Sequence, residues 1–203
     1  MYPKVLSDLI DSFKKLPGIG EKTAERLSFA VLNFDEDDIN MFSNSIINLH
    51  KKITHCSKCG TLTDQEYCSI CLDKTRNKDT LIVVEDSKDV FLFEKIGNFR
   101  GYYHVLGGLI SPLDDIGPND IRIKELINRI EEDNVKEIIL AIKSSIEADT
   151  TSLYIKKILE NKNIKITRIA SGIPIGAEMD YVDALTLESA LKNRMEIDSN
   201  FFN

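Results

Sequence analysis

Four cysteines form two Cys-x-x-Cys pairs, CSKC at 56–59 and CSIC at 68–71, with eight residues between them. In a tight turn this spacing brings two sulfurs to one edge of a tetrahedron, and the second pair completes the four-sulfur set that zinc accepts. The alternatives are a redox dithiol, which needs a thioredoxin-like strand–helix unit that this stretch lacks, and a metal-free loop. A site with four sulfur ligands has no open coordination position. We therefore predict one structural zinc ion per chain, held by Cys56, Cys59, Cys68 and Cys71.

A second segment suited to chemistry starts at Leu16 and reads LPGIGEKTAERL. Gly18 and Gly20 can adopt positive φ and leave their backbone N–H groups uncovered. The helix that follows begins here, so its first N–H groups and the positive end of its dipole can bind a phosphate. Lys22 and Arg26 lie one turn apart on one face of that helix. We predict that Gly18, Gly20, Lys22, Thr23 and Arg26 form a phosphate-binding site without sequence preference.

The alternative for this segment is a plain hairpin between two helices, in which the glycines only permit a tight turn. A nucleotide-binding P-loop is excluded, because the four-residue spacer of that motif is missing and no strand precedes the glycines. The proline, both glycines and the cations in helical register together resemble a helix-hairpin-helix DNA-binding motif.

Acidic side chains stand where two predicted strands end. Glu85 and Asp86 close the apolar run TLIVVE, and Glu147 and Asp149 follow the run EIILAI. Ligands of open α/β sheets gather at this edge, and carboxylates there can hold Mg²⁺. The alternative is that these carboxylates cap helices and compensate their dipoles, which competes most strongly for Asp86 and Asp149.

The rest of the sequence supplies the elements that must position these groups. The first fifty-odd residues predict three amphipathic helices, the third over 39–53 with Asp37 or Asp38 as its N-cap. After the cysteines, short β-branched runs alternate with helical patterns, which predicts βαβ units and a mainly parallel sheet. The predicted strands are 80–85, 137–142 and 164–170, and the predicted helices are 87–97, 121–133, 149–162 and 183–195.

Composition excludes several classes of protein. The 203 residues include 29% charged ones and carry a formal net charge of -7, which is typical of a globular chain. No apolar run reaches the length of a membrane helix, and no signal peptide is visible, so we expect a cytoplasmic protein without a membrane partner. The negative charge is only an average, and DNA binding depends on the local distribution of cations.

The order of these features resembles the RecR family of bacterial recombination mediators over nearly the whole chain. The resemblance is carried by the hairpin, the cysteine pairs, VVEDSKDV, the stretch from Tyr103 to Gly108, Ser111-Pro112-Leu113, and Thr167-Arg168-Ile169-Ala170 with Gly172, Pro174 and Gly176. It implies a multi-module α+β and α/β chain, with Lys22 and Arg26 at the family's DNA-contacting positions. The implied modules are a helix-hairpin-helix at 1–53, a zinc finger at 54–78, a Toprim domain at 79–175 and a C-terminal Walker B-like and oligomerisation segment at 176–203.

The same resemblance implies a non-catalytic function in DNA repair. The protein is expected to form a ring-like homotetramer around DNA and to act with RecO and RecF in loading RecA at gapped DNA. That function implies association with the bacterial nucleoid during repair.

The chain departs from catalytic Toprim enzymes at their metal site. Glu85 fills the position of the first metal ligand, but the two aspartates of the D-x-D pair fall on Lys143 and Ser145, and the glycine that follows is Ala148. A positively charged ammonium group at a ligand position repels Mg²⁺. The Walker B-like stretch AEMDYVDALTL has no Walker A partner. We therefore expect no catalytic residues, and a residual acidic site or partner surface at Glu85, Asp86 and Glu147.

Two other functions remain open at this point. One is a metal-dependent Toprim enzyme acting on nucleic acid, against which Lys143 and Ser145 argue. The other is a protein-interaction scaffold in which the glycine hairpin only packs.

Overall fold

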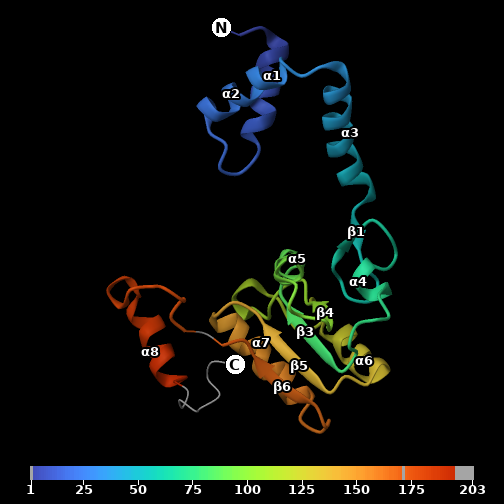
Figure 1. The fold of residues 1–203 in the computed structure, drawn as a ribbon, viewed down its shortest axis with the longest axis vertical. Coiled ribbons are helices and arrows are strands. Elements are labelled where there is room, and N and C mark those ends of the chain that lie inside the picture. The colour runs from blue at the N-terminus through green and yellow to red at the C-terminus, as the bar shows by residue number, and fades with distance from the viewer. Residues whose placement is uncertain (1, 171, 195–203) are drawn as a thin grey trace. The chain divides into compact units, whose positions relative to one another are not determined.

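The protein is described by a computed structural model, in which residues 2–170 and 172–194 are placed well enough to describe (Figure 1). The chain divides into two compact units, Met1–Ile53 and Thr54–Asn203. Each unit is considered on its own below.

The first unit contains three helices, α1 (Lys4–Lys14), α2 (Glu21–Val31) and α3 (Glu36–Lys52). Helices α1 and α2 form a hairpin that buries Ile10, Ala24 and Ser28. The third helix begins earlier than predicted. Its N-cap is Asp35, whose carboxylate accepts a hydrogen bond from the Asp38 backbone N–H at 2.8 Å, so the expected cap at Asp37 or Asp38 is wrong. Asp37 and Asp38 instead lie in the first turn, where their negative charges interact favourably with the positive end of the helix dipole.

The second unit opens with the cysteine-rich segment. Strands β1 (Thr54–His55) and β2 (Leu62–Thr63) pair antiparallel, and the short helix α4 (Ser69–Leu72) starts at the second cysteine pair. Gly60 makes the turn after the first pair with a φ of +78°. A Cβ at this position would lie 2.8 Å from Arg122 Nε and 3.0 Å from the Val105 carbonyl oxygen. The turn therefore requires glycine both for its φ and for the close approach of the adjacent chain.

The larger part of the second unit is a parallel sheet in the order β4-β3-β5-β6. Its strands are β3 (Thr80–Val84), β4 (Tyr102–Val105), β5 (Glu137–Ala141) and β6 (Lys165–Arg168). The connecting helices are α5 (Ser87–Ile96), α6 (Ile123–Asp133) and α7 (Ile146–Ile158). Leu81 to Val84 of β3 are all buried, as expected of a central strand covered on both faces. Strand β4 was not predicted from the sequence.

The strand order fixes where a site can form. From β3 the chain crosses to β4 on one side, and later returns to β5 on the other side of β3. Val84 and Ala141 are register partners at the carboxyl ends of β3 and β5. In open α/β sheets the crevice at such a reversal is where ligands bind. The residues that follow these two strands therefore meet at one point of the sheet edge.

The C-terminal segment contains a short 3₁₀ turn (Met179–Tyr181) and helix α8 (Ala184–Lys192). Asp183 caps α8 by accepting a hydrogen bond from the Thr186 backbone N–H at 2.9 Å. The predicted helix 183–195 ends earlier, and residue 195 lies outside the described residues. Within the described ranges, none of the helices is both long and apolar enough to cross a membrane.

Candidate metal and nucleic-acid sites

The four cysteines meet in one cluster. Their Sγ atoms all lie within 4.8 Å of one another, and those of Cys59 and Cys68 are 3.5 Å apart. Zinc–sulfur bonds of about 2.3 Å in a tetrahedron place the sulfurs about 3.8 Å apart, so the cluster has the size of a zinc site. Cys56, Cys59 and Cys68 are buried, and Cys71 is partly exposed.

The backbone around the cluster favours thiolates. The Cys68 N–H donates to Cys56 Sγ at 3.3 Å, and the Cys71 N–H points at Cys68 Sγ at 3.5 Å. Hydrogen bonds from the other cysteine side chains, Cys59 first, lower the pKa of Cys56, whereas Cys56 and the remaining thiols raise the pKa of Cys71. Four sulfurs this close cannot all lose their protons without a cation between them, so the donor set fits a divalent, thiophilic metal.

The cysteine pairs are attached to the parallel sheet through the backbone. The Val105 N–H, at the end of β4, donates to the Cys59 carbonyl oxygen at 2.8 Å, and the Cys56 N–H donates to the Thr61 carbonyl oxygen at the same distance. Arg122 adds a bond from Nη2 to the Ser57 carbonyl oxygen at 3.3 Å. The cluster therefore rests on the edge strand of the sheet.

The acidic edge of the sheet forms a second candidate site. Glu85 follows β3, and one of its carboxylate oxygens lies 3.1 Å from Lys143 Nζ, which follows β5. Asp86 is the N-cap of α5 and accepts a hydrogen bond from the Lys88 N–H at 2.9 Å, so the capping interpretation holds for this residue. These residues line a cavity of about 370 Å³. The ammonium group of Lys143 thus lies beside Glu85 at the carboxyl ends of β3 and β5.

The other acidic residues of this edge have separate partners. Glu147 lies in the first turn of α7, where a hydrogen bond from Ser145 lowers the pKa of its carboxyl group. Ser145 also caps α7 by accepting a hydrogen bond from the Ala148 N–H at 3.2 Å. Asp149 pairs with Arg168 of β6, with Oδ1 and Nη1 2.5 Å apart. Among the described residues, the four cysteines are the one group of three or more potential metal ligands, so the predicted acidic residues do not gather into one metal cage.

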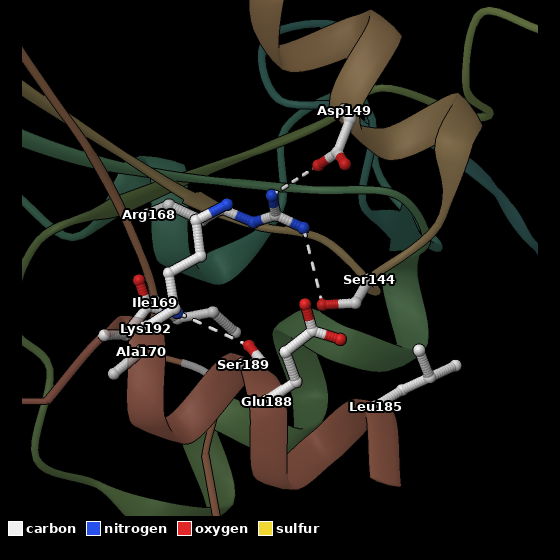
Figure 2. Close-up of a pocket in the computed structure, with 10 residues that line it drawn as sticks. Ser144, Asp149, Arg168, Ile169, Ala170, Leu185, Glu188, Ser189 and Lys192 are labelled. Carbon is white, nitrogen blue, oxygen red and sulfur yellow. Dashed lines mark hydrogen bonds and ion pairs between the residues drawn. The ribbon is translucent and has the colours of Figure 1, made fainter.

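Figure 2 shows a further cavity, of about 590 Å³, beside Arg168. The guanidinium group of Arg168 lies between Asp149 and Ser144, and its Nη2 is 3.5 Å from Ser144 Oγ. From α8 the figure labels four lining residues, Leu185, Glu188, Ser189 and Lys192. In the sequence, Arg168 stands out only through the family resemblance, and nothing there predicts its ion pair with Asp149.

The glycine hairpin has the geometry of an open helix start. Gly18 has a φ of +80°, whereas Gly20 is extended and serves as the N-cap of α2. A Cβ at either position would meet nothing within 4 Å, so both backbones are open to a ligand. No side chain caps α2, which leaves its first N–H groups available.

The cations behind the hairpin differ in their partners. Lys14 forms ion pairs with Glu21 at 2.5 Å and Asp11 at 3.4 Å. Lys22 and Arg26 are exposed, and neither forms an ion pair with any acid in the described ranges. Thr23 is half-buried beside them. The structure therefore brings together the five predicted phosphate-binding residues around one helix start, and DNA contact by them remains a prediction.

We expect Cys59→Ser to reduce the zinc content well below one ion per chain and to lower the melting temperature. The physical reason is that the metal contributes directly to folding of a segment with so little core of its own. Metal analysis and thermal unfolding measure both effects. Ser57→Ala, an exposed neighbour that offers no metal ligand, is the control and should retain wild-type zinc. Freshly purified wild-type protein with far less than one zinc per chain would contradict the assignment.

Comparison with known families agrees with the order of these parts. A family described as "RecR, helix-hairpin-helix" matches residues 6–50, and the RecR zinc finger domain with four cysteine ligands matches 53–73. "Toprim domain" matches 79–170, and "RecR, C-terminal" matches 172–195. The predicted fold class is thereby confirmed. Together with the geometry of the four cysteines, the zinc-finger match confirms the prediction of one structural zinc ion per chain.

Curated relatives are similar over almost their entire length. "Recombination protein RecR" of Staphylococcus saprophyticus is 46% identical over 196 residues, which cover 97% of this chain and 99% of the relative. The proteins of the same name from Streptococcus uberis and Streptococcus thermophilus are each 46% identical over 197 residues, or 97% of this chain and 100% of the relative. On these matches, and on the order of its helix-hairpin-helix, zinc-finger, Toprim and C-terminal parts, the chain belongs to the RecR family.

Proposed function

We propose that the protein is a non-catalytic mediator of recombinational DNA repair, which binds DNA without reading its sequence and acts with RecO and RecF to load RecA at gapped DNA. Membership of the RecR family supports a role in recombination repair, since its relatives are named as recombination proteins. The observation that carries DNA binding is the uncapped start of α2 with Lys22 and Arg26 behind it. We assign DNA binding to 1–53, the zinc finger to 54–78, the Toprim domain to 79–175, and the Walker B-like segment with the oligomerisation helix to 176–203.

The hairpin suits phosphate better than bases. Backbone N–H groups at a helix start and two flexible cations position a phosphate group without contacting base edges. With a net charge of -7, the rest of the chain repels DNA, so contact must be confined to such a local site. One hairpin supplies few contacts and little affinity. Several hairpins in one assembly convert later contacts into intramolecular ones, which raises avidity roughly 10²- to 10⁴-fold.

Helix α3 supports assembly. Ile39, Phe42, Ile46 and Leu49 recur at the three- and four-residue spacing of a helix seam, with exposed fractions of 38%, 41%, 57% and 64%. No described residue of α3 is buried. Its first turn is acidic, and its last turn carries His50, Lys51 and Lys52. Two copies of α3 packed antiparallel would cover both seams and place acid against base at each end, which is a suitable unit for a ring-like tetramer.

The acidic sheet edge supports a function without catalysis. Lys143 neutralises Glu85, and Ser145 is engaged as the cap of α7, so the two positions that carry aspartates in catalytic Toprim enzymes hold an ammonium group and a helix cap. Glu85, Asp86 and Glu147 are then available as a surface for a protein partner. The competing function, a metal-dependent Toprim enzyme, needs divalent-cation binding at the same edge.

We expect Lys22→Ala with Arg26→Ala to weaken binding to gapped, single-stranded and duplex DNA by similar factors. Each lost phosphate contact should also reduce the slope of log affinity against log salt by about 0.7 to 0.9. Titration at several salt concentrations measures both quantities. Lys156→Ala with Lys157→Ala, which removes two exposed charges from α7, is the matched control. If Lys22→Ala with Arg26→Ala changed neither the DNA affinity nor its salt dependence, the hairpin would be only a structural turn.

We expect Ile46→Asp to dissociate the assembly, because it places a charge within the apolar seam of α3. Helix α3 of the dissociated chain should remain folded, since Ile46 is already 57% exposed in the single chain. Light scattering gives the mass, circular dichroism gives the helix content, and DNA titration should show the loss of avidity. Asn44→Asp adds the same charge to an exposed position off the seam and should leave the mass unchanged. A wild-type mass for Ile46→Asp would show that α3 does not form the interface.

We expect the purified protein to show no cleavage or priming of nucleic acid with Mg²⁺ or Mn²⁺, and no ATP hydrolysis on its own. Glu85→Gln should change the free energy of unfolding by less than about 1 kcal/mol, because its ion pair with Lys143 is partly exposed. Nuclease assays and denaturant titrations provide the measurements. A nuclease that co-purifies with the wild type and disappears in Glu85→Gln would favour the enzyme instead.

A further inference from the structure

Arg129 of α6 is a buried cation next to the cysteine cluster. Its side chain is 3% exposed. Nη1 donates to the Tyr103 carbonyl oxygen at 2.5 Å, Nε lies 3.4 Å from Asp133 Oδ2, and Nη2 lies 4.0 Å from Cys71 Sγ. The guanidinium carbon also sits 5.6 Å from the centre of the Tyr102 ring. Since arginine is rarely this buried without a specific partner, each of these contacts needs an explanation.

The contacts of Arg129 extend to the other cysteine pair. Asp133, which Arg129 contacts, accepts a second bond from Lys58 Nζ at 2.8 Å. Lys58 lies between the two cysteines of the first pair, whereas Cys71 belongs to the second. The series Lys58, Asp133, Arg129 and Cys71 therefore connects both cysteine pairs through a single helix of the Toprim domain.

The charge of the zinc centre explains why a guanidinium belongs there. Four thiolates and one Zn²⁺ carry a net charge of about -2 in a site that is mostly buried, and such a charge is costly unless neighbouring groups offset it. Partners behind metal ligands orient those ligands and tune the affinity for the metal. Arginine remains charged at all working pH values and has five donors in a fixed plane, so it can hold Cys71 while bonding to the backbone and to Asp133.

A purely structural role for Arg129 would not explain its contact with Cys71. Arg76 shows what such a role looks like in this chain, because it is also buried, with its side chain 8% exposed. Its Nη1 and Nη2 both bond to Glu94, at 2.9 and 2.5 Å, and Nη1 also donates to the Gly101 carbonyl oxygen at 3.1 Å. No described contact of Arg76 involves a cysteine. Arg129 has an equivalent carboxylate and carbonyl, and in addition it directs a third nitrogen at a zinc ligand.

We propose that Arg129 is a positioning residue of the zinc centre, which holds Cys71 and offsets the negative charge of the four thiolates, so that helix α6 sets how tightly the cysteine pairs retain zinc. This inference goes beyond the proposed DNA-binding function and does not depend on it.

The experiment compares three variants of the full-length, zinc-loaded protein: Arg129→Met, Arg129→Lys and the matched control Arg76→Met. Competition with a colorimetric chelator gives the zinc affinity and the rate of zinc release, at a temperature where circular dichroism shows each variant folded. We expect Arg129→Met to weaken zinc affinity 10- to 100-fold. Arg129→Lys should recover part of the loss, because it keeps the charge but not the planar set of donors. Arg76→Met should match the wild type.

A spectroscopic measurement separates the effect on the ligands from a loss of stability. In cobalt-substituted protein, the thiolate-to-metal charge-transfer band should shift in Arg129→Met and stay in place in Arg76→Met. Wild-type zinc affinity and an unshifted band in Arg129→Met would overturn the proposal, and so would an equal loss of zinc affinity in Arg76→Met. If Arg129→Met does not fold, the rate of zinc release is compared between Arg129→Lys and Arg76→Lys. Faster release from Arg129→Lys alone supports the proposal. Equal rates of release from the two variants overturn it.

Discussion

Four thiolates held within 4.8 Å of one another repel each other unless a divalent cation lies between them. The regular secondary structure of the cysteine-rich segment is short. Strands β1 and β2 are two residues long, and α4 has four residues. The turn at Gly60, the bond from Val105 to Cys59 and the ion pair between Lys58 and Asp133 all lie within or beside the first cysteine pair. A metal that fixes the four sulfurs therefore also fixes the residues through which this segment contacts the parallel sheet.

Several cations of the parallel sheet and its edge form ion pairs with acids of the same unit. Lys143, Lys136, Lys165 and Arg168 each pair with an acid on the sheet or its edge. In the first unit Lys14 is paired, and Lys22 and Arg26 have no acidic partner in the described ranges. A chain with a net charge of -7 thus still presents two cations without an acidic partner directly behind the start of α2. At the edge of the parallel sheet the ammonium group of Lys143 likewise lies beside an acid, Glu85.

Much of this organisation follows from local sequence patterns. The spacing of the cysteines predicts their cluster, the β-branched run at Leu81–Val84 predicts a central strand, and Gly97 ends α5 with a φ of +77°. These features depend on residues close together in the chain, where spacing and propensity act directly. The candidate site at Glu85 was predictable because strand ends gather at one edge, but its neutralisation by Lys143 depends on the strand order.

The features that were missed depend on distant contacts. Strand β4 contains two tyrosines and a histidine, and it is a strand because the sheet buries all four of its residues. Arg129 carried a signal that could have been used: it lies between Leu126 and Ile130, on the buried face of an amphipathic helix, where a cation implies a specific partner. Which partner it finds is decided by residues 58 positions away. Sequence periodicity can reveal such a buried charge but cannot identify what it contacts.

The sequence distance between the cysteine pairs and α6 affects the order in which the site forms during translation. The ribosome produces the cysteine pairs well before α6, since Cys71 precedes Arg129 by 58 positions and Lys58 precedes Asp133 by 75. At about 5 to 20 residues per second, this interval lasts roughly 3 to 15 seconds. During it, the thiols of the nascent chain have neither the sheet nor the arginine beside them. The four cysteines are therefore available to a metal before α6 exists, whereas the contact of Arg129 with Cys71 forms only after α6 has emerged.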